Sequence, residues 1–126
     1  MKRATREWAR KAEGDWQVAQ REAQAANPVW DAVCFHAQQC AEKYLKALLE
    51  EQGVAFSKTH DLVVLLHLSE RHVAELNALE SDLAFLSPLA IATRYPGSSA
   101  DSELASSAMM IPGRVRAIIQ TDLNMV

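Results

Sequence analysis

The sequence predicts an all-α fold, an up-and-down bundle of four to five helices. Three observations carry this prediction. Ala, Leu, Glu, Gln, Lys and Arg, all good helix formers, dominate the 126 residues. Only 4 Gly and 4 Pro are present, so turns are few and elements are long. Apolar side chains recur at three- and four-residue steps, and no segment shows convincing strand alternation. We therefore interpret residues 1–126 as one helical domain.

The first two predicted helices are long. The first runs from Arg3 to Ala26 and ends at Asn27-Pro28, and the second runs from Pro28 to Gln52 with Gly53 as its C-terminal stop. The buried positions expected for the two are Ala9, Ala12, Trp16, Ala19 and Ala23, and then Val33, Ala37, Ala41, Tyr44, Leu45, Leu48 and Leu49.

The rest of the chain predicts shorter helices. Thr59 is a good N-cap for a third helix that starts near His60. A fourth covers His72–Ala92, with Ser87-Pro88 late in that segment, where it either kinks or ends the helix.

The clearest loop of the chain follows, at residues 93–99. A last helix begins at about Asp101, and Pro112-Gly113 either kinks it or splits it in two.

Charge and hydropathy restrict the function classes. The net charge of −3 argues against a domain that grips nucleic acid through its overall field. No apolar run reaches the length of a membrane span, and the start, MKRATREWARK, has no apolar central stretch like that of a secretory signal. With only Cys34 and Cys40 as cysteines, we expect a cytoplasmic protein.

The first two helices carry several candidate polar residues. Asp15 lies nearly in line with Trp8 and is expected to face inward, either in a structural ion pair or in a functional cleft. His36 and Cys40 share a helical face at a spacing compatible with metal binding, but no second pair of ligands appears. Packing is therefore the favoured interpretation, and we expect neither metal nor cofactor.

Lys43 and Lys46 follow on the second helix. They can hold a phosphate as point charges, or they can belong to a solvated face. His60, near a helix N-terminus that disfavours imidazolium, can act as a base or simply pack the turn.

The loop at Arg94-Tyr95-Pro96-Gly97 is the most distinctive feature. Arg94 offers a fork for phosphate, and Tyr95 offers a ring for stacking on a base. The alternative is a structural corner in which Tyr95 packs and Arg94 pairs with a carboxylate.

Together these segments resemble the HEPN domain family. The resemblance covers almost the whole chain in the expected order. The segments that carry it are Trp8–Ala19, Phe35–Gln39, Ala41–Lys43, Leu45–Leu49, Thr59–Leu62 and Arg94–Pro96.

The resemblance implies a bundle of about five helices, often a homodimer, in a prokaryotic stand-alone protein. It also implies a small nucleotidyltransferase-like partner, arranged with it as a toxin–antitoxin pair. Many members of the wider superfamily cut RNA without metal, using an Arg followed after four to six residues by a His.

This chain departs from that pattern. No Arg is followed by His at that spacing, because Arg71 and His72 are adjacent and no His follows Arg94. Binding of a nucleotide or RNA, with Arg94, Tyr95, His60, Lys43 and Lys46 as contacts, is therefore the leading hypothesis. A metal-independent ribonuclease toxin, with Arg94 as cation and His60 as base, and a structural antitoxin or scaffold subunit are the alternatives. Tyr95 is also a possible site of modification by the partner.

Overall fold

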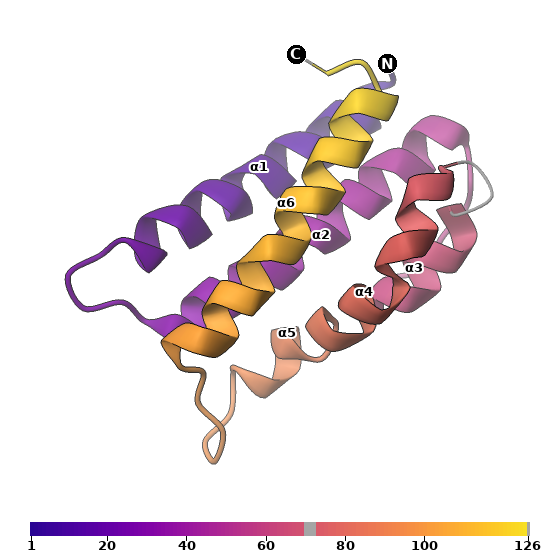
Figure 1. The fold of residues 1–126 in the computed structure, drawn as a ribbon. Coiled ribbons are helices and arrows are strands. Elements are labelled where there is room, and N and C mark those ends of the chain that lie inside the picture. Colours follow the sequence, from indigo (N-terminus) through magenta and orange to yellow (C-terminus); the bar gives the residue numbers. More distant parts are fainter. Residues whose placement is uncertain (70–72, 126) are drawn as a thin grey trace.

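The computed structural model describes residues 1–69 and 73–125 (Figure 1). These residues form helices and connecting turns with no strand, so the predicted all-α class is confirmed. The elements are α1 (Arg3–Ala23), α2 (Trp30–Gln52), α3 (Leu62–Ser69), the 3₁₀ helix η1 (Ala74–Leu79), α4 (Glu80–Leu86), α5 (Leu89–Ala92) and α6 (Ser102–Asp122).

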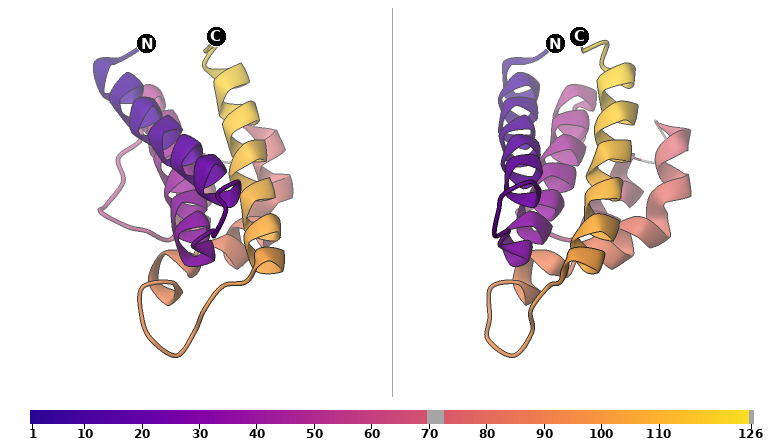
Figure 2. Two further views of the ribbon diagram at one scale, coloured as in Figure 1. Left: turned by 90° about the vertical axis from the view of Figure 1, so that its left-hand side faces the viewer. Right: turned by 60° about the vertical axis from the view of Figure 1, so that its left-hand side comes forward.

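The central helix is α2. Both α1 and α6 pack along it, α3 and α5 contact another side, and α4 packs against α3 and α6 (Figures 1 and 2). Thirteen of its 23 residues are buried, among them Tyr44, Leu45, Leu48 and Leu49 with at most 1% of their surface exposed. A helix covered on several sides must satisfy its polar side chains inside the protein, and this is the condition that builds the site described below.

The ends of the first two helices follow the sequence closely. α1 ends at Ala23, three residues earlier than predicted, and α2 begins at Trp30, two residues after Pro28. Gly53 ends α2 with φ +70°, a left-handed conformation that glycine adopts without steric cost.

The prediction that Thr59 caps the third helix is wrong. The cap is Asp61, whose Oδ1 accepts from the main-chain N–H groups of Val63 and Val64 at 3.0 and 3.3 Å. Thr59 Oγ1 instead accepts the N–H of Asp61, so Thr59 stabilises the turn before the helix. The helix therefore starts at Leu62, and His60 lies outside it.

The long helix predicted for His72–Ala92 is divided. Its start lies outside the described residues, and its remainder forms η1, α4 and α5, with the break at Ser87-Pro88. By contrast, α6 is one helix that continues through Pro112, so of the two alternatives, a kink or a split, the split does not occur. Pro112 is buried together with Ala108, Ile111 and Val115, and this packing offsets the hydrogen bond that proline cannot donate. Within the part of the chain that is described, no helix has the length and apolarity needed to cross a membrane.

Candidate functional site

The candidate site lies along one side of α2. Residues four, seven and eleven positions apart share a side of a helix, so Phe35, Gln39, Glu42 and Lys46 form one row, and His36 and Lys43 form the next. We call these six residues the α2 strip. Their contacts place the strip between Asp15 of α1 and the segment of residues 56–61.

Asp15 joins α1 to the strip. Its carboxylate is buried, with 10% of the side chain exposed, and bridges two partners. Oδ1 accepts from His36 Nδ1 at 2.7 Å, and Oδ2 accepts from Lys43 Nζ at 2.7 Å. Asp15 therefore faces inward, as its register with Trp8 predicts, and both partners keep part of their surface at the solvent, 28% for His36 and 22% for Lys43.

Glu42 is the centre of the second cluster. This carboxylate is 3% exposed and accepts from Lys46 Nζ at 3.0 Å, from Gln38 Nε2 at 3.3 Å and from His60 Nδ1 at 2.9 Å. Lys46 is itself 7% exposed, and its ammonium lies against the rings of Trp8 and Phe56. The solvated-face interpretation of Lys46 is therefore wrong, and the buried ion pair with Glu42 disfavours a phosphate contact by its ammonium.

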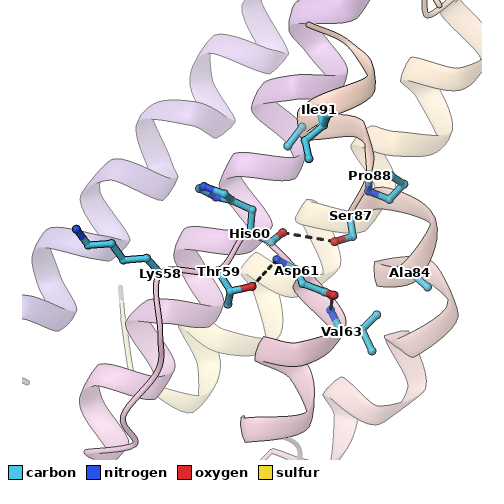
Figure 3. Close-up of a pocket in the computed structure, with 10 residues that line it drawn as sticks. Lys58, Thr59, His60, Asp61, Val63, Ala84, Ser87, Pro88 and Ile91 are labelled. Carbon is cyan, nitrogen blue, oxygen red and sulfur yellow. Dashed lines mark hydrogen bonds between the residues drawn. The ribbon is translucent and has the colours of Figure 1, made fainter. Parts of the chain in front are cut away.

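The main chain of His60 is fixed by hydrogen bonds, whereas its ring is exposed to solvent. In Figure 3 its ring points away from Asp61 and Ser87 and extends to the same side as Lys58. The main-chain carbonyl of His60 accepts from the buried Gln38 amide at 3.1 Å and from Ser87 Oγ at 3.4 Å. The side chain remains 66% exposed. The same segment, with α5, borders a hollow of about 650 Å³.

Arg94 approaches the strip from the loop after α5. Its guanidinium lies 5.1 Å from the centre of the Phe35 ring, and Phe35 in turn packs edge-on against His36. Arg94 makes no ion pair with any carboxylate of the described residues, so it is not the paired arginine of a structural corner. Tyr95 next to it is 62% exposed and does not pack.

The charge balance of this surface is slightly positive even with the exposed Asp61, which borders the same hollow as Lys58. Two buried carboxylates, Asp15 and Glu42, are offset by Lys43 and Lys46. Arg94 and Lys58 are exposed and form no salt bridge within the described ranges. Exposed cations without counter-charges, beside two histidines, form a surface suited to an anionic ligand.

A different polar network lies on the α6 side of α2. Arg116 donates to both oxygens of Glu13, Tyr44 also donates to Glu13, and Gln120 donates to the Tyr44 oxygen at 3.0 Å. The Arg116 guanidinium holds the pKa of Glu13 below its usual value, and burial raises the pKa of Tyr44. This network joins α1, α2 and α6, and no local sequence pattern indicates it because its members lie up to 103 residues apart.

The four-residue spacing of His36 and Cys40, although compatible with metal binding, is explained by packing. His36 Nδ1 is taken by Asp15, and Cys40 is completely buried, where desolvation raises the pKa of its thiol. Across residues 1–69 and 73–125 there is no cluster of three or more His, Cys, Asp and Glu arranged to hold a metal ion.

Comparisons with known proteins agree on one family. The model of the HEPN domain family matches residues 5–122. The chain is similar to the crystal structure of TT1696 from Thermus thermophilus, with a TM-score of 0.83 and 25% identity over 96% of this chain and 98% of that one. It has the same fold as ST0689, an archaeal HEPN homologue, with a TM-score of 0.76 and 24% identity over 98% and 99% of the two chains. No curated protein matches.

Proposed function

This chain belongs to the HEPN domain family, and we propose that it binds a nucleotide or an RNA segment through phosphate at the α2 strip. In this proposal Arg94 and His60 contact the ligand, Lys43 adds charge from the Asp15 side, and Tyr95 stacks on a base. Lys46 is excluded from ligand contact because it is buried against Glu42.

The observation that carries the proposal is the placement of Arg94. An exposed arginine normally gains little from being ordered, because its side chain loses rotamer freedom. Here the guanidinium lies over Phe35 and no carboxylate of the described residues takes its charge. A cation oriented in this way keeps its hydrogen-bond donors for a ligand, and its planar fork suits phosphate.

The spacing along α2 favours a ligand with more than one contact point. Arg94 lies at Phe35 and His60 at Glu42, seven residues further along the same side of the helix. At 1.5 Å per residue this separation is about 10 Å. A nucleotide that spans phosphate and sugar, or two neighbouring phosphates of a strand, reaches both positions.

The decisive experiment compares two arginines. Titration calorimetry with adenosine and guanosine nucleotides and with a short single-stranded RNA is expected to show binding that Arg94→Ala weakens at least tenfold, about 1.4 kcal/mol. Arg114→Ala is the matched control, because Arg114 is also exposed but pairs with Asp82. Absence of heat with all these ligands up to millimolar concentration rejects the proposal.

A ribonuclease activity is the second candidate. A base needs an orienting partner, and His60 has one in Glu42 while Arg94 lies on the same side of α2 as a possible cation. Incubation of purified protein with total RNA in the presence of EDTA tests this candidate. Intact RNA, together with unaffected growth on expression, rejects it.

The setting we propose is a two-protein toxin–antitoxin system in which this chain forms a homodimer and joins a nucleotidyltransferase-like protein. The support is the family membership alone. Co-expression with the adjacent gene product, size-exclusion chromatography and intact mass test it. A stable complex, or nucleotide mass added to this chain, supports the system and directs attention to exposed Tyr95. A lone, unmodified chain contradicts it.

A further inference from the structure

Two histidines, His36 on the α2 strip and His60 beside it, contact a buried carboxylate in the same way. His36 directs Nδ1 to Asp15 at 2.7 Å, and His60 directs Nδ1 to the two oxygens of Glu42 at 2.9 and 3.1 Å. In both cases the carboxylate is buried and comes from a different element than the histidine. Within the described residues no hydrogen bond occupies Nε2 of either ring.

The chemistry of the carboxylate fixes the tautomer. An ionised carboxylate has acceptors only, so the histidine nitrogen that faces it must carry a proton. A neutral imidazole has one N–H, and its other nitrogen is then an acceptor. Both rings are therefore Nδ1–H tautomers when neutral, with Nε2 left free to contact another molecule.

Ion pairing of the two carboxylates with Lys46 and Lys43 does not account for the histidine contacts. Lys46 already offsets the charge of Glu42, yet His60 Nδ1 lies within hydrogen-bond distance of both carboxylate oxygens. Asp15 likewise gives one oxygen to Lys43 and the other to His36.

The main chain of His60 is fixed as well. Gln38, with none of its surface exposed, donates both to Glu42 and to the His60 carbonyl, and Ser87 donates to the same carbonyl. An exposed ring held at its main chain and at Nδ1 is preorganised for a contact at Nε2.

We propose that Glu42 and Asp15 are positioning residues that hold His60 and His36 with Nε2 directed to the ligand of the α2 strip. The tautomer follows from the structure of the free protein, whereas the ligand contact rests on the proposed function. Gln38 belongs to the same arrangement, because it orients Glu42 and the His60 main chain together.

The first test is ¹⁵N NMR of the imidazoles in the ligand-free protein, under alkaline conditions where the rings are neutral. We expect the Nδ1–H tautomer for both histidines, assigned with His36→Ala and His60→Ala. Asp15→Asn is expected to lose this preference at His36 only. The double variant Glu42→Gln/Lys46→Met is expected to lose it at His60 only. The amide that replaces the carboxylate carries a donor as well as an acceptor, so it no longer requires a proton on Nδ1, and no lysine is left buried and unpaired.

Glu50→Gln is the matched control, since Glu50 lies two turns further on α2 and contacts Trp8 rather than a histidine. It should change neither ring. An Nε2–H tautomer in the unmodified protein, or a preference that survives both carboxylate variants, overturns the proposal.

The second test uses AMP as the ligand. If Glu42 acts through His60, then Glu42→Gln/Lys46→Met and His60→Ala weaken binding by a similar factor, and combining them adds little, as a double-mutant cycle measures. Additive losses, or undiminished binding by the Glu42 variant, overturn the positioning role. Failure of AMP and all other nucleotides to bind, with the expected tautomers present, rejects the proposed function and leaves the histidine arrangement standing.

Discussion

Two polar networks lie on opposite sides of α2, and they differ in how far their outermost charged or titratable side chain is exposed. In the network of Glu13, Tyr44, Arg116 and Gln120, the contacts run between members and join three helices. In the network of Gln38, Glu42, Lys46 and His60, the first three are buried but His60 is 66% exposed with Nε2 unused by the described residues. We call the first network closed, because Arg116 and Glu13 pair with each other and are at most 31% exposed, and the second open, because it ends at the exposed ring of His60.

In our proposal this difference, rather than residue type, separates structural from ligand-binding polar groups. Both networks contain a carboxylate and a cation, and both link α2 to distant segments. A buried polar group must be satisfied in either case, so its burial says nothing about function. The informative feature is a donor or acceptor that is held in place by the network and points out of it.

The largest effect should come from breaking the buried ion pair of the open network. Lys46→Ala leaves Glu42 in the interior with its main counter-charge removed, and we expect a loss of about 3–5 kcal/mol in the free energy of unfolding. The comparison is Glu42→Gln/Lys46→Met, which removes both charges and should cost much less. Urea unfolding measures both. Equal losses would show that the uncompensated charge of Glu42 contributes little to the cost of Lys46→Ala.

The closed network should be less sensitive because it lies nearer the surface. Arg116→Ala removes the donors to Glu13, whose side chain is 29% exposed, and also the contact of Arg116 with the Trp16 ring. We expect a loss of about 2 kcal/mol in the free energy of unfolding, with nucleotide affinity unchanged. A clear loss of affinity in the folded variant would mean that the two networks are coupled through α2.

The closed network should also give the protein part of its acid sensitivity. The pKa of Glu13 is lowered by the Arg116 hydrogen bond, so this carboxylate stabilises the fold above its unfolded pKa, near 4.5, and the contribution is lost as pH falls through the lower folded value. Glu13→Gln should therefore cost about 1 kcal/mol at neutral pH and progressively less below about pH 4.5. Unfolding curves of both proteins from neutral to acid pH measure this, and a constant difference would contradict it.

The sequence predicted the fold better than it predicted the site, for a physical reason. Helix periodicity is local, so α1 and α2 could be placed within three residues from the apolar pattern, Pro28 and Gly53. Local capping was less certain, because Thr59 and Asp61 both have side chains that cap, and only tertiary contacts such as Ser87 to Leu62 favour the later start of α3.

The site depends on contacts between distant residues. Asp15 could be expected to face inward, but its partners His36 and Lys43 are 21 and 28 residues away. The sequence singled out Lys43 and Lys46 on the second helix, but it did not show that Lys46 is buried. Nothing in the local sequence shows this, because Trp8 and Phe56, whose rings lie against the Lys46 ammonium, belong to distant segments. The burial of Lys46 depends on the segment of residues 56–61, which has no periodic pattern.

The smallest effect tests how Arg94 is oriented. Phe35→Leu keeps an apolar side chain at the strip but removes the ring beneath the guanidinium, and an exposed cation–π contact contributes about 0.5–1 kcal/mol. We expect nucleotide affinity to fall about two- to fivefold, because Arg94 must then be ordered by the ligand itself. The control is Trp16→Leu, which removes the ring beneath Arg116 in the closed network and should leave affinity unchanged. Calorimetry at one temperature measures both variants. If Phe35→Leu binds as tightly as the unmodified protein, the ring does not orient Arg94, and the ligand itself orders this arginine in both proteins.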